Sequence, residues 1–524
     1  MNSDNFRLED TFESAFSSIQ AIERNFVPVF KIEEVGFIVS VSTAIAKVSG
    51  LRSVGYNEVL SFPSGILGIA FNLDEDEIGV VLLGDYSGLH AGDPVKRTGR
   101  VMDVAVGMNL LGRVIDPLGL PLDGNEAISS TKRLPIERPA PPIMDRAAVT
   151  VPLQTGLKVI DALIPIGRGQ RELILGDHQT GKTAIAVATI LNQFDKNVVC
   201  VYCAIGQRAS AVAKTVATLK EKGAMDYTVV MVTEGSDPPG LTFVAPYAAT
   251  SIAEFFMEAG RDVLIVYDDL THHARAYREI SLLLRRPPGR EAFPGDIFYI
   301  HSRLLERSTH LNQDRGGGSL TALPIIETEA QDISAYIPTN LISVTDGQIY
   351  LSPSLFELGT LPAVDVAKSV SRVGGQAQFA AYRAAAGDLK LAYSQFEELE
   401  TFSRFGASVD EETRLRIEHG KRIRACLKQS EFAAVDVTAQ ITVLLALSSK
   451  LFDSIALNQM TLAENALQHA SGKIPPEVQK RFENEKKISP ADQELILQIA
   501  KNALLPFMSK PDPKKTDQKK VDQK

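Results

Sequence analysis

The spacing of hydrophobic and polar residues changes along the chain, and the first pattern is typical of a small all-β domain. From about residue 27 to residue 95, short β-branched runs are separated by Gly, Pro, Asn and Asp. Three of these runs are Gly36–Val41, Ala44–Val48 and Gly79–Leu83. Short strands between turn residues predict a β-barrel, which we place over residues 27–96.

The second pattern is an alternation of strand-like and helix-like segments between about Leu153 and Ile349. It predicts a parallel sheet covered by helices on both faces, in a domain that spans residues 97–376. The expected strands are Glu172–Leu175, Val198–Ala204, Thr228–Val232, Val263–Tyr267 and Ile297–Ile300. The expected helices are Thr183–Gln193, Ser210–Lys222, Ala248–Ala259 and His273–Leu284.

The third pattern is helical and begins after about Ala377, where strand-like runs fade. It predicts a helical bundle over residues 377–509, in which one helix opens with the capping box Ser408-Val-Asp-Glu411. The expected fold class is therefore multidomain, with an N-terminal β-barrel, a central α/β domain built on a parallel sheet and a C-terminal helical bundle.

The two ends of the chain differ from these domains. Residues 1–26 are polar with Phe12, Phe16 and Ile19 at helical spacing, which predicts an amphipathic helix that either packs on its own domain or docks on a partner. This segment lacks the basic and apolar regions of a secretory signal, and we expect none. Residues 510–524 contain only Lys, Pro, Asp, Thr, Gln and Val and are expected to be disordered.

Composition narrows the function classes. The net charge of −9 argues against nucleic acid as the main ligand. No apolar run approaches the roughly 18 residues that span a bilayer, so membrane association is expected only through partners. The pair Cys200-Val-Tyr-Cys203 matches a metal or redox motif, but residues three apart on a strand face opposite sides. We expect both thiols to pack in the core.

The strongest chemical motif is Gly176-Asp-His-Gln-Thr-Gly-Lys-Thr183, a complete G-x-x-x-x-G-K-T between a predicted strand and a predicted helix. Its glycines let backbone N–H groups close around phosphate, and the helix N-terminus adds a positive dipole end. Lys182 supplies a cation, and the Thr183 hydroxyl can bind Mg²⁺. The motif predicts a P-loop that binds a nucleotide with Mg²⁺.

A carboxylate should follow a neighbouring strand to serve the metal, and Val263–Asp269 ends in two of them. We expect Asp268 to face the metal and Asp269 to cap the next helix. His272 and His273 could suggest a metal site, but adjacent helical residues do not face one another, so a solvated helix start is favoured. His178 lies inside the P-loop, where such a position usually contributes only its backbone.

Four longer strings resemble the alpha subunits of F-type ATP synthases: Lys158–Arg171, Leu284–Glu291, Ser302–Arg307 and Ser369–Gly375. The resemblance runs from about residue 27 to about residue 505. It implies a ring of three alpha and three beta subunits, with nucleotide at the interfaces and a central stalk gamma subunit inside. It also implies a peripheral stalk or delta-type subunit held by the N-terminal helix, and coupling to transmembrane ion transport.

The same resemblance implies a peripheral location on the cytoplasmic face of a bacterial plasma membrane, or on the equivalent face of an organelle membrane. Two features are similar to alpha rather than beta: the P-loop interior Asp-His-Gln-Thr, and Gly206-Gln207-Arg208 where beta has Gly-Glu-Arg. That Glu polarises the attacking water in beta, whereas an amide cannot act as a base. The chain's own site should therefore bind ATP or ADP without turnover.

The resemblance also assigns roles to individual residues. Arg372 matches an arginine finger that reaches the neighbouring beta site, with an ordinary interface salt bridge as the alternative. Ser343 matches a residue of that interface, and Ser369 lies on the turn that presents the finger. Thr183 and Asp268 serve Mg²⁺. The residues expected to bind nucleotide are Gly176, Asp177, His178, Gln179, Thr180, Gly181, Lys182, Thr183, Ala184 and, near the base, Gln429.

Some positions depart from the family pattern and indicate a divergent branch, such as an alternate bacterial form. His178 replaces the usual Arg, and Leu361 and Glu431 stand where many alpha subunits have Arg and Gln. The main alternative function is a homohexameric P-loop motor of helicase-like or secretion type, which needs a glutamate at the place of Gln207. A regulatory nucleotide-binding protein is a third possibility, against which the Arg372 motif argues.

Overall fold

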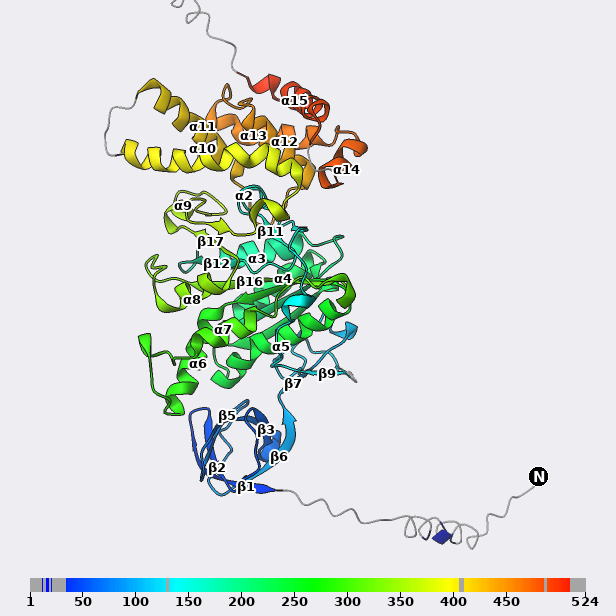
Figure 1. Cartoon of the computed structure of the whole chain (residues 1–524), viewed down its shortest axis with the longest axis vertical. Coiled ribbons are helices and arrows are strands. Elements are labelled where there is room, and N and C mark those ends of the chain that lie inside the picture. Colours follow the sequence, from blue (N-terminus) through cyan, green and yellow to red (C-terminus); the bar gives the residue numbers. More distant parts are fainter. Residues whose placement is uncertain are drawn as a thin grey trace, which may run out of the picture.

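A computed structural model describes residues 34–128, 132–404, 410–484 and 488–508, together with Phe12, Phe16, Ser17 and Gln20. The described residues form a β-barrel, a central α/β domain and a helical domain, stacked along the long axis (Figure 1). This arrangement confirms the expected fold class. Most of the expected N-terminal helix and the tail 510–524 lie outside the described residues, and the domain boundaries remain predictions.

The barrel closes from six strands in the order β1-β2-β5-β4-β3-β6. Successive side chains along a β-strand point to opposite faces, so each strand turns alternate residues into the barrel. Ile38, Val48, Leu60, Val80 and Val95 fill the interior and are at most 2% exposed. The strands are β1 (Val35–Ser42), β2 (Ile45–Ser49), β3 (Glu58–Ser61), β4 (Leu67–Leu73), β5 (Ile78–Leu82) and β6 (Pro94–Val101).

The central sheet has eight strands in the order β18-β17-β12-β16-β15-β13-β14-β8, and only β18 runs antiparallel to its neighbour. Parallel strands place all their carboxyl ends at one edge. The strands are β8 (Val114–Ile115), β12 (Leu173–Gly176), β13 (Val198–Gln207), β14 (Thr228–Glu234), β15 (Asp262–Asp268), β16 (Ser319–Glu327), β17 (Gly347–Leu351) and β18 (Val370–Ser371).

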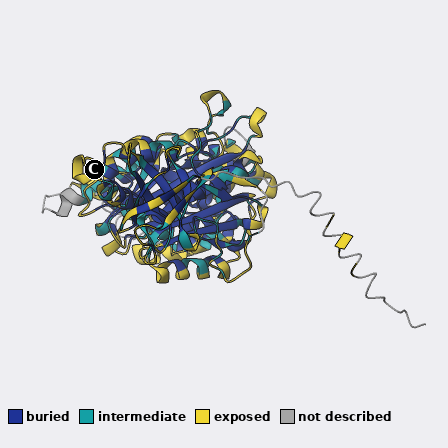
Figure 2. Ribbon diagram, turned by 90° about the horizontal axis from the view of Figure 1, so that it is seen from below, coloured by how far each residue is buried: buried dark blue, intermediate teal, exposed yellow. Residues whose placement is uncertain are grey.

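Helices cover both faces of this sheet, and the strands form the buried centre of the molecule (Figure 2). Leu173 and Leu175 pack into one core cluster, while Ile174 packs into the other. Cys200 and Cys203 likewise enter opposite clusters and are fully buried, as expected for core thiols. The helices are α2 (Lys158–Leu163), α3 (Lys182–Leu191), α4 (Ala209–Glu221), α5 (Pro239–Glu258), α6 (Leu270–Leu283), α7 (Ile297–Leu305), α8 (Tyr336–Val344) and α9 (Pro353–Glu357).

The predicted strand Ile297–Ile300 is wrong, because these residues begin helix α7. Ile297, Ile300 and Leu304 are buried at helical spacing, whereas Phe298 and Tyr299 are exposed. Four apolar residues alone do not separate a strand from a buried helix turn. The missing central strand is β16, which contains Pro324, a residue uncommon in central strands.

The C-terminal domain is helical, with α12 (Val437–Ser448) buried among its neighbours. Its α11 (Glu411–Leu427) is capped by Asp410, whose side chain accepts a hydrogen bond from the Thr413 amide. The predicted capping box from Ser408 is therefore wrong, because the Asp410 carboxylate, directly before the first turn, takes this role. The other helices are α10 (Ala380–Arg404), α13 (Met460–Ser471), α14 (Pro476–Asn484) and α15 (Pro490–Leu504).

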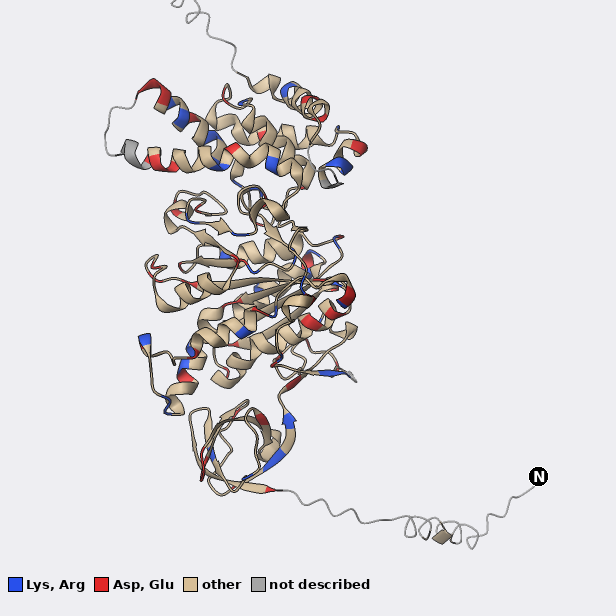
Figure 3. Cartoon of the chain, in the orientation of Figure 1, with Lys and Arg blue, Asp and Glu red and all other residues tan. Residues whose placement is uncertain are grey.

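The distribution of charged and apolar residues over the described structure agrees with the sequence-based expectations. Acidic and basic residues are interspersed through the three domains (Figure 3). Within the described ranges, no helix combines the length and apolar character needed to cross a membrane.

Candidate functional site: a nucleotide cleft

The P-loop connects β12 to α3, as the motif predicted. Gly181 adopts φ +97°, a left-handed conformation that glycine takes without strain. Lys182 is only 6% exposed, and its Nζ donates hydrogen bonds to the carbonyl oxygens of Gly176 (2.9 Å) and Asp177 (2.8 Å). Burial lowers the pKa of Lys182, although nearby carboxylates oppose this shift. The lysine is thus held beneath the loop, where its charge can meet a phosphate.

A cleft of about 480 Å³ opens over this loop and has a polar end and a more apolar end. The polar end is lined by the P-loop and by the carboxyl ends of β13, β15 and β16. The apolar end is lined by segments from two domains, including Phe356, Leu361, Pro362 and Phe432. This division suits a ligand with a phosphate tail and an aromatic base.

Two side-chain oxygen atoms that could bind a metal ion meet at the polar end, beside the loop. The Thr183 hydroxyl lies 2.7 Å from Asp268 Oδ2, to which the Tyr202 hydroxyl also donates at 2.8 Å. Burial raises the pKa of Asp268, and these hydrogen bonds oppose the rise. A hydroxyl and a carboxylate side by side are the oxygen ligands that Mg²⁺ favours, so this pair fits the metal of a Mg-nucleotide.

Asp269 has the separate role expected of it. Its Oδ1 accepts a hydrogen bond from the His272 amide at 3.0 Å and caps α6. The side chain is 2% exposed, and burial, with the neighbouring carboxylates, raises its pKa to about 6.

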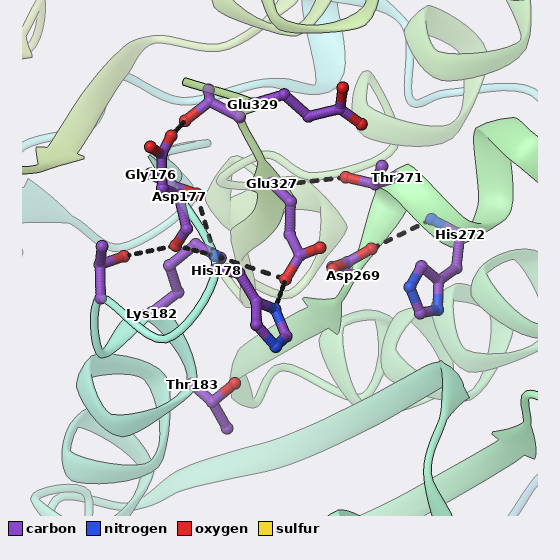
Figure 4. A network of polar contacts seen from close by, with 12 residues as sticks. Gly176, Asp177, His178, Lys182, Thr183, Asp269, Thr271, His272, Glu327 and Glu329 are labelled. Carbon is purple, nitrogen blue, oxygen red and sulfur yellow. Dashed lines mark hydrogen bonds and ion pairs between the residues drawn. The ribbon is translucent and has the colours of Figure 1, made fainter. Parts of the chain in front are cut away.

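Glu327, at the end of β16, is a cleft residue that the sequence reading missed. Its Oε1 lies 2.8 Å from His178 Nδ1 and 3.6 Å from Lys182 Nζ (Figure 4). The His178 side chain therefore has a contact of its own, with this carboxylate, whereas the expectation that His178 offers the nucleotide only its backbone stays a prediction. Recognising β16 would have found Glu327, since its carboxyl end meets the P-loop at the same sheet edge.

The two adjacent histidines are not a solvated helix start. His273 is fully buried and stacks on Phe243 with ring centroids 5.4 Å apart. His272 is half-buried, with Nδ1 2.8 Å from the Gly206 carbonyl oxygen. The helical geometry separates the two rings, as expected, but both are packed.

Gln429 lies at the apolar end and is fixed by the backbone around it. Its Oε1 accepts from the Lys158 amide at 3.1 Å, and its Nε2 donates to the Gly156 carbonyl at 2.7 Å. The Lys158 ammonium is buried and also contacts Glu464 of α13. The loop that lines this end is therefore joined to both the central and the helical domain.

Arg372, Ser343 and Ser369 are not among the residues that line the cleft. Arg372 is exposed and donates to the carbonyl oxygens of Thr345 and Ile342, both at 3.2 Å. Ser369 is buried; its hydroxyl donates to Asp365 O at 2.5 Å and accepts from the Tyr350 amide at 2.9 Å. Ser343 is exposed on α8, the helix whose end holds Arg372.

Family profiles match three consecutive parts of the chain. The β-barrel domain of the ATP synthase alpha/beta family matches residues 31–99, and its nucleotide-binding domain matches residues 156–371. The C-terminal domain of the ATP synthase alpha/beta chain matches residues 378–503. The three matches coincide with the barrel, the P-loop domain and the helical domain.

Curated relatives are similar over nearly the whole chain. ATP synthase subunit alpha 2 of Albidiferax ferrireducens is 72% identical over 515 residues, which cover 98% of this chain and 96% of the relative. ATP synthase subunit alpha 1 of a Marinomonas species is 69% identical over 501 residues, covering 96% and 98%. That of Chlorobium luteolum is 63% identical over 497 residues, covering 95% and 97%. The chain belongs to the ATP synthase alpha/beta family and, within it, to the alpha subunits of the F-type ATP synthases.

Proposed function

We propose that the chain is a non-catalytic subunit of the ring, which holds Mg-ATP or Mg-ADP in its own cleft and serves catalysis at a neighbouring beta subunit. Gln207 carries this proposal. Its Nε2 donates to the backbone oxygen and to Oδ1 of Asp268, both at 3.2 Å. An amide that donates its N–H groups to the metal carboxylate has no basic atom with which to activate water.

Within that proposal, the polar end of the cleft positions the nucleotide. Lys182 and the P-loop amides bind the phosphates, and Thr183 and Asp268 would hold Mg²⁺, which neutralises phosphate charge when bound. Gln179, Thr180 and Ala184 line the same end of the cleft. Gln429 and its loop hold the base end. These roles allow occupancy without turnover.

Arg372 acts, in the proposal, on the beta site. Its guanidinium is exposed and held only through two backbone carbonyls, and no carboxylate in the described part of the chain lies within ion-pair distance of it. Ser369 fixes the turn before it, and Ser343 belongs to the same face. An exposed arginine that is held by backbone carbonyls, and that forms no ion pair within the described residues, suits a finger that meets a partner's phosphate.

The family implies a complex with beta and other subunits that is peripheral to a membrane. We propose contacts with beta in a three-plus-three ring, with the gamma subunit of the central stalk, and with a peripheral-stalk or delta-type subunit through residues 1–26. The proposal includes coupling to transmembrane ion transport and a place on the cytoplasmic face, or the equivalent organelle face.

The test compares the isolated full chain with the chain assembled with beta and gamma. The proposal expects the isolated chain to bind Mg-ATP in equilibrium dialysis without hydrolysing it, and the assembled ring to hydrolyse it. Steady hydrolysis by the isolated chain would support a self-sufficient motor instead. Co-purification of tagged chain from its host, with or without residues 1–26, tests the peripheral-stalk contact.

A further inference from the structure

Three metal-binding side chains meet beside the phosphate end of the cleft. One ligand atom each of Asp269, His272 and Glu327 lies within 4.8 Å of the other two. Asp269 and His272 come from the start of α6, and Glu327 comes from the end of β16. In Figure 4 the carboxylates of Asp269 and Glu327 lie close together, with His178 on the far side of Glu327.

The imidazole of His272 is already oriented. Its Nδ1 lies 2.8 Å from the Gly206 carbonyl oxygen, and a carbonyl can only accept a hydrogen bond. In the neutral ring the proton is therefore on Nδ1, and Nε2 carries the free lone pair. A Cβ at Gly206 would lie 2.9 Å from Nδ1, so the glycine permits this approach. Metal-binding histidines are commonly fixed by such a contact to a backbone carbonyl.

The two carboxylates are also held in place. Asp269 is 2% exposed and is anchored through Oδ1 to the His272 amide. The Glu327 amide donates to the Thr271 hydroxyl at 2.9 Å, which joins the end of β16 to the start of α6. His178 Nδ1, 2.8 Å from Glu327 Oε1, orients the second carboxylate. The two carboxylates repel one another at this separation, and the Lys182 ammonium, 3.6 Å from Glu327 Oε1, offsets part of that repulsion.

We propose that Asp269, His272 and Glu327 bind a divalent transition-metal ion of the Zn²⁺ class. Ligand bonds to Zn²⁺ are about 2.0–2.2 Å, so two ligand atoms on one ion are at most roughly 4.4 Å apart. The three ligand atoms, which all lie within 4.8 Å of one another, are close to this limit. Three protein ligands leave a further position, which would open towards the phosphate end.

The imidazole separates this site from the proposed Mg²⁺ position. Thr183 and Asp268 offer only oxygen atoms, which suit Mg²⁺, whereas an imidazole nitrogen favours Zn²⁺ and related ions. The two positions also use different residues. Zn²⁺ binding at this site needs no bound nucleotide, and the proposal does not depend on the function proposed above.

The test uses the purified full chain, stripped of metal and nucleotide, and dialysed against Zn²⁺ in a large excess of Mg²⁺. We expect about one retained Zn²⁺ per chain that His272→Gln loses. His90→Gln, which changes an exposed histidine of the barrel, is the matched control and should retain it. Thr183→Ala should retain Zn²⁺ as well, even where Mg-ATP binding weakens. Co²⁺ as the probe should give visible absorption that disappears in His272→Gln.

Three outcomes would overturn the proposal: no Zn²⁺ retained by the wild type, equal retention by His272→Gln, or complete displacement of Zn²⁺ by Mg²⁺. Should His272→Gln fail to fold, Glu327→Gln tests the same site from a different strand and should also lose the ion. Because the assay contains no nucleotide, a failure to bind Zn²⁺ would not contradict the proposed function. Equally, normal Zn²⁺ binding would not support the proposed function if the nucleotide experiments contradicted it.

Discussion

The nucleotide cleft and the Arg372 face are two regions of one domain that differ in completeness. In the cleft, Lys182 is buried, and Thr183, Asp268 and Gln207 are joined to one another by hydrogen bonds. On the other face, Arg372 is exposed, and its guanidinium donates hydrogen bonds to the backbone oxygens of Thr345 and Ile342. In the proposed function, the first region binds its ligand alone, whereas the arginine of the second region meets a group that another subunit supplies.

The largest effect is expected from Arg372→Ala. Phosphoryl transfer spreads negative charge over the γ-phosphate oxygens, and a finger arginine stabilises it. Removing the guanidinium should reduce ATP hydrolysis by the assembled ring by roughly 10³-fold or more, because fingers elsewhere contribute on that order. Steady-state hydrolysis measures this. Near-normal turnover would remove the distinction between the two regions.

Lys182→Ala changes the cleft instead. It removes the buried cation that faces the phosphates, so Mg-ATP affinity of the isolated chain should fall at least about tenfold, roughly 1.4 kcal/mol. Equilibrium binding of labelled ATP measures it, with Lys214→Ala as a control at the cleft rim. Unchanged affinity would show that the P-loop does not hold the phosphates.

A severalfold effect is expected from Gln429→Ala at the base end. The substitution removes the hydrogen bonds to Gly156 and Lys158 that fix this loop. Affinity for ATP should fall, whereas affinity for pyrophosphate should not, because the P-loop is untouched. Equal losses for both ligands would mean that Gln429 acts through overall stability rather than through the base end.

The smallest effect is expected from Gln207→Glu. It places a carboxylate where a general base would stand, but Arg372 lies outside this cleft and cannot complete it. Hydrolysis by the isolated variant should stay at the background of the wild-type chain. Measurable turnover would show that the cleft can hydrolyse ATP without a partner subunit. It would contradict the claim that catalysis requires the Arg372 face to meet another subunit.

Some parts of the fold and of the cleft were predictable from the sequence, and others were not. The P-loop, Asp268 and the Asp269 cap were predictable because each depends on local order: a strand, then glycines, a cation or acids. The barrel and the parallel sheet followed from hydrophobic spacing. Glu327 is not predictable from the local pattern, because Pro324 is uncommon in a central strand such as β16. The strand predicted at Ile297–Ile300 is wrong because four apolar residues carry too little periodicity to separate a strand from a helix.

The base end was harder to predict for a different reason. Gln429 meets Gly156 and Lys158 across more than 270 positions of chain, and Lys158 reaches Glu464 of α13. No local pattern encodes contacts between segments so far apart. Its assignment came from resemblance alone, as did that of Arg372, whose exposed position has no periodic signature.

The most direct test of the central claim measures two quantities on one assembled ring that carries Arg372→Lys. Lysine keeps the charge but not the planar, two-pronged donor geometry. We predict that hydrolysis falls by orders of magnitude while nucleotide occupancy of this chain's own P-loop, detected by photolabelling, remains that of the wild type. Normal hydrolysis, or equal loss of occupancy and hydrolysis in an intact ring, would contradict the account.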